Sequence, residues 1–201
     1  GSSTRVLYNS VLMSSNRGPL ADQSPSYALA ITGSDPTVEL KNNALATTQI
    51  TNQGSGGANA KSYAIGMQSS TFANLDANHN AYFSSGPDAG FFRSGSLAGG
   101  AGTNYTTIAA WRAAIGDDAN SLQVDPLFVS NTDPHLQATS TLAGAGTPIA
   151  GVTVDYDDQA RSASAPSIGA DEVPIIPSAF SISDVSVNEG NADNTALSFS
   201  I

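Results

Sequence analysis

The sequence predicts an all-β fold in which short parallel strands are stacked coil upon coil, and three observations predict it. Gly, Ala, Ser, Thr and Asn dominate while only 12% of residues are charged. This composition suits tight turns because Asn and Gly accept a positive φ. A sequence unit recurs at intervals of about 35 residues. Within each unit, apolar and polar residues alternate with the period of a strand.

The repeat is clearest where residues 38–47, VELKNNALAT, are aligned with residues 75–84, LDANHNAYFS. Apolar, charged and turn positions coincide, and Asn43 falls on Asn80. A weaker copy, TRVLYNSVLM, places Asn9 at the same position, so the three asparagines are 34 and 37 residues apart. The copies are separated by polar loops of variable length, and the repeat ends near residue 85.

Each copy contains two strands that meet at a corner. Val38 and Leu40 alternate with polar neighbours, then a pair such as Asn42-Asn43 follows, and a second short strand begins. Because Asn tolerates the left-handed conformation, it is the natural corner residue. The equivalent pair in the next copy is His79-Asn80.

Two or three short strands per repeat cannot bury a face alone, whereas stacked coils pair every strand with the one above and below. The predicted architecture is therefore a parallel β-helix of about three coils. The sequence resembles the right-handed parallel β-helix proteins, whose stacked Asn ladder would be supplied by Asn9, Asn43 and Asn80. By this interpretation, His79 is a corner neighbour on the outer surface.

Stacking at these offsets places residues of related type in columns. Arg5, Glu39 and Asp76 fall in one outward column, and Tyr27 falls over Tyr63 in another. Column neighbours of opposite charge or aromatic type stabilise a sheet, so both columns are interpreted as structural. The alternative is that a glycan lies along the exposed aromatic column of Tyr27 and Tyr63.

A short helix is predicted after the coils. Thr106 or Thr107 begins it, Ile108, Trp111 and Ile115 share one face, and Gly116 ends it. Laid over the last coil, such a helix or a loop would cover an unpaired edge. Trp111 is then part of the lid, and a sugar-binding platform is the alternative.

The segment from residue 121 to 172 contains DPLF, HL, AGAGT and a closing IGADE in that order. It resembles the terminal segment of many secreted bacterial right-handed β-helix proteins, and the resemblance covers residues 105–172. It implies coils and loops in residues 1–104, a C-terminal cap in residues 105–172, and an extracellular or cell-surface location.

Three aspartates in DYDDQAR are candidate ligands for calcium, namely Asp155, Asp157 and Asp158. Calcium prefers six to eight oxygen ligands, and alternating Asp residues supply some of them. The alternative is a turn in which one Asp pairs with Arg161.

Residues 173–179 are predicted to be a linker, because two prolines fix an extended path. Residues 180–201 alternate apolar and polar side chains and resemble the opening of a Calx-β type β-sandwich. By that likeness Glu189 would join a calcium site. Because 22 residues cannot complete a sandwich, the chain is expected to be a piece of a longer protein, with further coils before it and further domains after it.

Charge and composition exclude several classes of partner. A net charge of -10 would repel a phosphate backbone and an anionic membrane surface. The chain has no cysteine, so disulfides and thiolate metal sites are excluded. It also has no apolar run long enough for a membrane span.

Two functions remain open from the sequence. The favoured one is a non-catalytic structural or adhesive module of a secreted or cell-surface bacterial protein, which binds a polysaccharide or cell-surface glycan. The alternative is the C-terminal part of a polysaccharide lyase or glycoside hydrolase with its catalytic coils upstream. No spacing indicates an acid and base pair, and neither His79 nor His135 accompanies a G-x-S-x-G nucleophile motif.

Overall fold

A computed structural model of the 201-residue chain describes residues 3–18, 24–50, 61–98 and 100–174. The linker prediction beyond residue 174, the Calx-β-like segment and Glu189 lie outside these residues. The described elements are β1 (Thr4–Leu7), β2 (Ser10–Met13), β3 (Ser26–Ile31), β4 (Val38–Lys41), β5 (Ala44–Thr47), β6 (Ser62–Met67), β7 (Leu75–Asn78), β8 (Ala81–Ser84), β9 (Ala89–Ser94), β10 (Thr103–Tyr105), α1 (Ile108–Ile115), β11 (Phe128–Ser130) and β12 (Asp133–Leu136).

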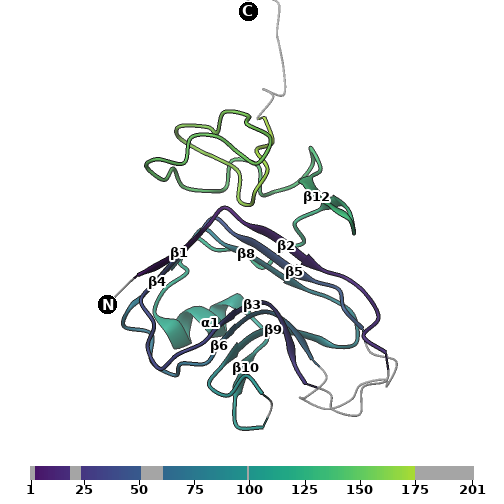
Figure 1. The fold of residues 1–201 in the computed structure, drawn as a ribbon, viewed down its shortest axis with the longest axis vertical. Coiled ribbons are helices and arrows are strands. Elements are labelled where there is room, and N and C mark those ends of the chain that lie inside the picture. The colour runs from purple at the N-terminus through teal and green to yellow at the C-terminus, as the bar shows by residue number, and fades with distance from the viewer. Residues whose placement is uncertain (1–2, 19–23, 51–60, 99, 175–201) are drawn as a thin grey trace, which may run out of the picture.

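Nine strands form three parallel sheets, with orders β1-β4-β7, β2-β5-β8 and β3-β6-β9. Successive strands of the chain lie in different sheets, and each pairs with the strand one repeat later. In Figure 1 the three sheets form three sides around α1. The prediction of an all-β fold with stacked parallel strands is confirmed.

The register also agrees with the sequence alignment. Glu39 pairs with Arg5 on one side and with Asp76 on the other. Ala44 pairs with Ala81, and Tyr27 pairs with Tyr63. Residues 38–47 and 75–84 therefore occupy the same two sheets in neighbouring coils.

The stacking continues beyond residue 85, where the sequence repeat was expected to end. Strand β9 pairs in parallel with β6, although the pairing shifts register twice. Strand β10 then adds to β9 in the antiparallel direction. The register shifts displace the apolar residues of β9 from their expected positions, which explains why the repeat is not visible in the sequence there.

The inner faces of the three sheets enclose a continuous apolar core that α1 completes. Trp111 is fully buried and its ring stacks on Phe92 with centroids 5.3 Å apart. The Thr107 side chain accepts a hydrogen bond from the Ala110 N–H at the start of α1, and Gly116 ends it with φ 75. The predicted helix is confirmed, and no helix in the described parts of the chain is long and apolar enough to cross a bilayer.

Three asparagines form a hydrogen-bonded ladder along one corner. The Asn43 carboxamide oxygen accepts from the backbone N–H and the Nδ2 of Asn9, at 3.0 and 2.9 Å. The Asn80 oxygen accepts from the same two groups of Asn43, both at 3.0 Å. Ser121 Oγ then takes the position of a further rung and accepts from the Asn80 N–H at 2.8 Å.

The left-handed backbone conformation falls on the residue before each ladder asparagine. Tyr8, Asn42 and His79 have φ values of 53, 59 and 53, so the ladder asparagines contribute through their side chains instead. At Asn42 an asparagine takes the left-handed conformation as expected, whereas Tyr8 and His79 take it at the other two corners. His79 is half-buried, and its Nδ1 lies 3.0 Å from the Ala145 carbonyl oxygen, so it is not a free surface residue.

The outward charged column is held by alternating charges. Arg5 Nε donates to Glu39 Oε2 at 2.5 Å, and this bond lowers the pKa of Glu39. Lys41 Nζ lies 3.6 Å from Glu39 Oε1 and 2.6 Å from Asp76 Oδ2, so the lysine links those two carboxylates. The column therefore acts between coils as predicted, with Lys41 as an additional member.

The aromatic column packs against glycines. The rings of Tyr27 and Tyr63 stack with centroids 5.2 Å apart. A Cβ added to Gly66 would lie 2.3 Å from Tyr27 Cε1, and one added to Gly90 would lie 2.6 Å from Tyr63 Cδ1. Each tyrosine ring therefore occupies space that only a glycine leaves free.

Replacing Gly66 by alanine is expected to lower the free energy of unfolding by about 1–3 kcal/mol, the usual cost of overpacking. The new methyl group would push the Tyr27 ring away from its stack on Tyr63. Urea unfolding followed by circular dichroism measures the change. In a Tyr27→Ala background the same replacement should cost less, and equal costs in both backgrounds would contradict this explanation.

The segment after α1 docks on the outside of the corner that carries the ladder. Asn42 Nδ2 donates to the Thr147 carbonyl and its Oδ1 accepts from the Thr147 N–H, at 2.8 and 2.9 Å. The Tyr8 hydroxyl donates to the same carbonyl. Figure 1 shows this segment outside the corner between sheets β1-β4-β7 and β2-β5-β8. The segment thus contacts coils along the stack, while α1 closes the core.

A second apolar cluster lies under this segment. Ala44 and Ala81 on the outer side of β5 and β8 pack with Leu142 and Ile168, which are fully buried. The IGADE sequence belongs here, because the Gly169 N–H donates to the Asn42 carbonyl at 2.8 Å. Docking therefore combines apolar burial with backbone hydrogen bonds to the corner.

Candidate functional site

The aromatic residues predicted to contact a glycan are held inside the protein. Tyr63 and Trp111 are fully buried. Tyr27 is half-buried, its hydroxyl donates to the Leu97 carbonyl at 2.8 Å, and burial raises its pKa to about 12. Tyr63 and Trp111 therefore present no open face to a sugar, and Tyr27 is engaged in its stack on Tyr63 and its hydrogen bond to Leu97.

Asp155 of the predicted calcium site organises its own loop. Its Oδ1 accepts from the Asp157 and Gln159 N–H groups, at 2.9 and 2.8 Å, and its Oδ2 accepts from the Glu172 N–H at 2.9 Å. Asp158 is exposed with φ 63. Asp155 and Asp158 therefore serve the turn, and only Asp157 is directed toward another cluster.

Arg161 does not pair with an aspartate of this turn. Arg161 is buried, and its Nη1 lies 3.4 Å from Glu172 Oε2. Its guanidinium carbon lies 4.0 Å from the centre of the Tyr8 ring. It also donates to the Gly169 and Ala170 carbonyls. The predicted Asp–Arg161 pair is wrong, and Arg161 instead fixes the docked segment to the corner.

A cavity of about 390 Å³ lies beside β12, and its lining includes two aspartates, a histidine and a tyrosine of the docked segment. We call it the His135 cleft. Its lining residues are Ser10, Thr132, Asp133, Pro134, His135, Tyr156, Ala170 and Asp171. They come from β2, from the β11–β12 hairpin, from the turn that Asp155 organises and from the IGADE sequence.

His135 is held between two carboxylates at the edge of this cleft. Its Nδ1 contacts Asp133 Oδ1, and its Nε2 lies 2.7 Å from Asp157 Oδ2. The period of the strand places Asp133 and His135 on the same face of β12. Hydrogen bonds to Asp133 and Asp157 raise the pKa of His135 to about 9, so the ring is an imidazolium at neutral pH.

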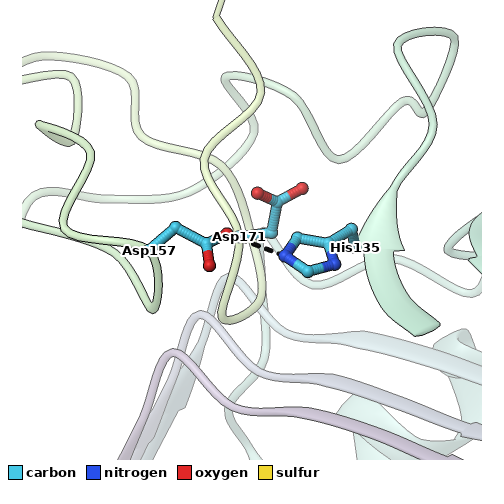
Figure 2. Close-up of side chains that lie close together, drawn as sticks. All are labelled: His135, Asp157 and Asp171. Carbon is cyan, nitrogen blue, oxygen red and sulfur yellow. Dashed lines mark hydrogen bonds and ion pairs between the residues drawn. The ribbon is translucent and has the colours of Figure 1, made fainter. Parts of the chain in front are cut away.

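Asp171 completes a cluster with His135 and Asp157. One ligand atom from each of the three lies within 4.8 Å of the other two. Figure 2 shows that Asp157 and Asp171 approach the His135 ring from different segments of the chain. Asp171 is only 7% exposed, and its Oδ2 accepts from the Leu136 N–H at 2.8 Å, which fixes it relative to β12.

Tyr156 gives the cleft an exposed aromatic face. It is 79% exposed, and its ring lies edge-on to His135 with centroids 6.5 Å apart. An aromatic face next to carboxylates offers both apolar contact and hydrogen-bond acceptors to one ligand. This combination is typical of a site for a polar ligand with an apolar face.

The sequence indicated little of this site. It offers His135 only as a candidate catalytic base, and it does not distinguish Asp133, Tyr156 and Asp171 from other polar residues. The D-x-H spacing in a strand was the available signal, because it puts an aspartate and a histidine on one face. No spacing connects these two residues to Asp157 and Asp171, which reach the cleft only through docking of the segment.

Comparison of this chain with family models, with curated proteins and with solved structures finds no match in any of the three.

Proposed function

We propose that the chain is part of a right-handed parallel β-helix in a secreted or cell-surface bacterial protein, where it serves as a non-catalytic structural and adhesive module. The stack provides a stiff support, and the His135 cleft binds a polysaccharide or cell-surface glycan. The observation that carries this proposal is the exposed Tyr156 ring at a cleft lined with carboxylates.

The polar groups of the coils support a structural role. The ladder asparagines bond to one another, and the outward carboxylates of Glu39 and Asp76 are each paired with a cation. A glycosidase needs one carboxyl group that is free to donate a proton and a second that acts as base or nucleophile. Glu39 and Asp76 are already used to hold neighbouring coils together.

The glycan-binding role favours Tyr156 over the tyrosine column predicted from the sequence. A sugar ring stacks on an aromatic face while its hydroxyl groups donate to carboxylates. Asp133 and Asp171 line the same cleft and supply such acceptors.

Tyr156→Ala is expected to weaken glycan binding by about tenfold or more, since an aromatic anchor is often the dominant contact of a small site. A glycan array with the wild-type chain identifies a ligand, and titration with that ligand measures the change. Tyr156→Phe is the matched control, because it keeps the ring, and it should bind nearly as the wild type does.

The same samples distinguish the module from an enzyme. Polysaccharides incubated with the protein should be recovered without new reducing ends or unsaturated products. Release of either product would favour the lyase or hydrolase alternative. Retention of glycan that is equal in the wild type and Tyr156→Ala would contradict the assignment to the His135 cleft.

A further inference from the structure

We propose that His135, Asp157 and Asp171 form a binding site for a divalent transition-metal ion of the zinc type. The site goes beyond the proposed glycan-binding role and does not depend on it. It also differs from the calcium site predicted from Asp155, Asp157, Asp158 and Glu189, with which it shares only Asp157.

One pair of donor atoms is close to the spacing that a tetrahedral ion needs, and the third donor, from Asp171, lies within 4.8 Å of both. His135 Nε2 and Asp157 Oδ2 are 2.7 Å apart, at hydrogen-bonding distance. Bonds of about 2.0–2.1 Å to zinc place two tetrahedral ligands about 3.3 Å apart. Asp157 is on an exposed turn with its side chain 38% accessible, so a shift of about 0.6 Å requires no change in the core.

Asp133 holds the histidine ring as metal sites commonly require. Its carboxylate contacts Nδ1, which leaves Nε2 directed toward Asp157. In a metal site this arrangement fixes the tautomer and makes the ligating nitrogen a better donor. The Asp133 contact also explains why the ring is oriented although His135 is partly exposed.

Asp171 is a buried carboxylate with an unused oxygen. Its Oδ2 accepts from the Leu136 N–H, and no other hydrogen bond is formed by its carboxylate among the described residues. Burial of a carboxylate is costly unless a cation or donors compensate. The residues that line the cleft include no lysine or arginine, and His135 is the one cation among them, so a bound metal ion would add positive charge beside Asp171.

The donor set selects a transition ion over calcium. Imidazole nitrogen suits zinc, copper, iron and nickel, whereas calcium takes oxygen ligands in larger number. One nitrogen and two carboxylate oxygens leave an open coordination position, as in zinc sites with three protein ligands. That position would face the cavity beside Tyr156.

The test is calorimetric titration of the whole chain with zinc chloride. One ion should bind per chain, and Asp157→Asn and His135→Gln should each weaken binding by more than about a hundredfold, the upper end of what loss of an orienting partner costs. Asp133→Asn replaces the carboxylate that contacts Nδ1 with a neutral amide, changes none of the three ligands, and should weaken binding by about 10–100-fold. Circular dichroism confirms that each variant is folded.

Two variants serve as matched controls. His79→Gln changes the other of the two histidines, and Asp76→Asn removes an exposed carboxylate on a different sheet. Both should bind zinc as the wild type does. Tyr156→Ala should also retain zinc, so a failure of glycan binding and a failure of metal binding are distinguishable.

Several results would overturn the proposal. One is a wild-type chain that takes up no zinc, and another is zinc affinity that is unchanged in both Asp157→Asn and His135→Gln. A parallel titration with calcium chloride tests the alternative ion. Tighter binding of calcium than of zinc, lost in Asp155→Asn and kept in His135→Gln, would replace this site with the calcium site predicted from the sequence.

Discussion

Asp118→Asn is expected to lower the free energy of unfolding by about 3 kcal/mol or more, because it disrupts a buried network in which each unpaired group costs about 1–3 kcal/mol. Asp118 is fully buried. Its Oδ2 accepts from the Tyr82 hydroxyl at 2.8 Å and from Trp111 Nε1 at 3.0 Å. Its Oδ1 accepts from Asn80 Nδ2 at 3.2 Å and from Ser121 Oγ at 2.5 Å. The carboxylate thus joins the ladder, the last coil and α1.

An asparagine at this position cannot satisfy the same donors. Its amide nitrogen must replace one of the two oxygens, and each oxygen faces one N–H group that cannot accept, Trp111 Nε1 or Asn80 Nδ2. Either orientation therefore leaves two donors opposed in a buried site. The substitution should not strain the backbone, because Asp118 has φ 64 and Asn tolerates that region well.

Urea unfolding followed by Trp111 fluorescence measures the effect, since Trp111 is the one tryptophan of the chain and contacts Asp118 directly. Asp76→Asn is the control, because it makes the same chemical change at an exposed position and should cost about 0.5 kcal/mol or less. Equal effects of the two substitutions would show that the Asp118 network contributes no more than a surface ion pair.

The features predicted correctly are those that repeat in the sequence. Strand register follows from the alignment of Asn9, Asn43 and Asn80, because a stack forces equivalent positions of successive coils into contact. Helix α1 follows from a local cap and an apolar face. Both signals depend on neighbours that are fixed, either one repeat away or within one turn of helix.

The features not predicted depend on contacts without a fixed spacing. Tyr8 adopts positive φ although a bulky residue rarely does so, because the docked segment and the ladder fix the corner from both sides. Arg161 pairs with Glu172 and not with Asp155, which is closer in the sequence, because the Asp155 carboxylate accepts backbone hydrogen bonds within its own turn.

The candidate site belongs to this second group. Asp133 and His135 come from β12, whereas Asp157 and Asp171 come from two later turns. The sequence predicts only one of the four, Asp157, as a ligand, and it predicts it for calcium. A repeating scaffold can therefore be predicted from a single sequence. A site assembled from an irregular segment can be identified only in the folded structure, because no fixed spacing relates its residues.

Asn43→Ala is expected to destabilise the stack by about 3 kcal/mol, because it leaves several buried polar groups unpaired at once. The side chain is fully buried, and its oxygen accepts both Asn9 donors. Its Nδ2 donates to the Val6 and Lys41 carbonyls and to the oxygen of Asn80. Alanine replaces none of these bonds.

The position along the ladder provides the control. Asn9 is exposed at the end of the ladder, and its side chain only donates, to Leu7 and to Asn43, so Asn9→Ala should cost about 1 kcal/mol, the worth of a typical hydrogen bond. The order of unfolding provides the sharper expectation. In a stacked array, stability is the sum of coil and interface contributions. Loss of the Asn43 rung should therefore release the first coil before the core around Trp111 unfolds. Circular dichroism should then change at lower urea than Trp111 fluorescence in Asn43→Ala, whereas both should change together in the wild type. Coincident transitions with a cost no larger than that of Asn9→Ala would mean that apolar burial alone couples the coils.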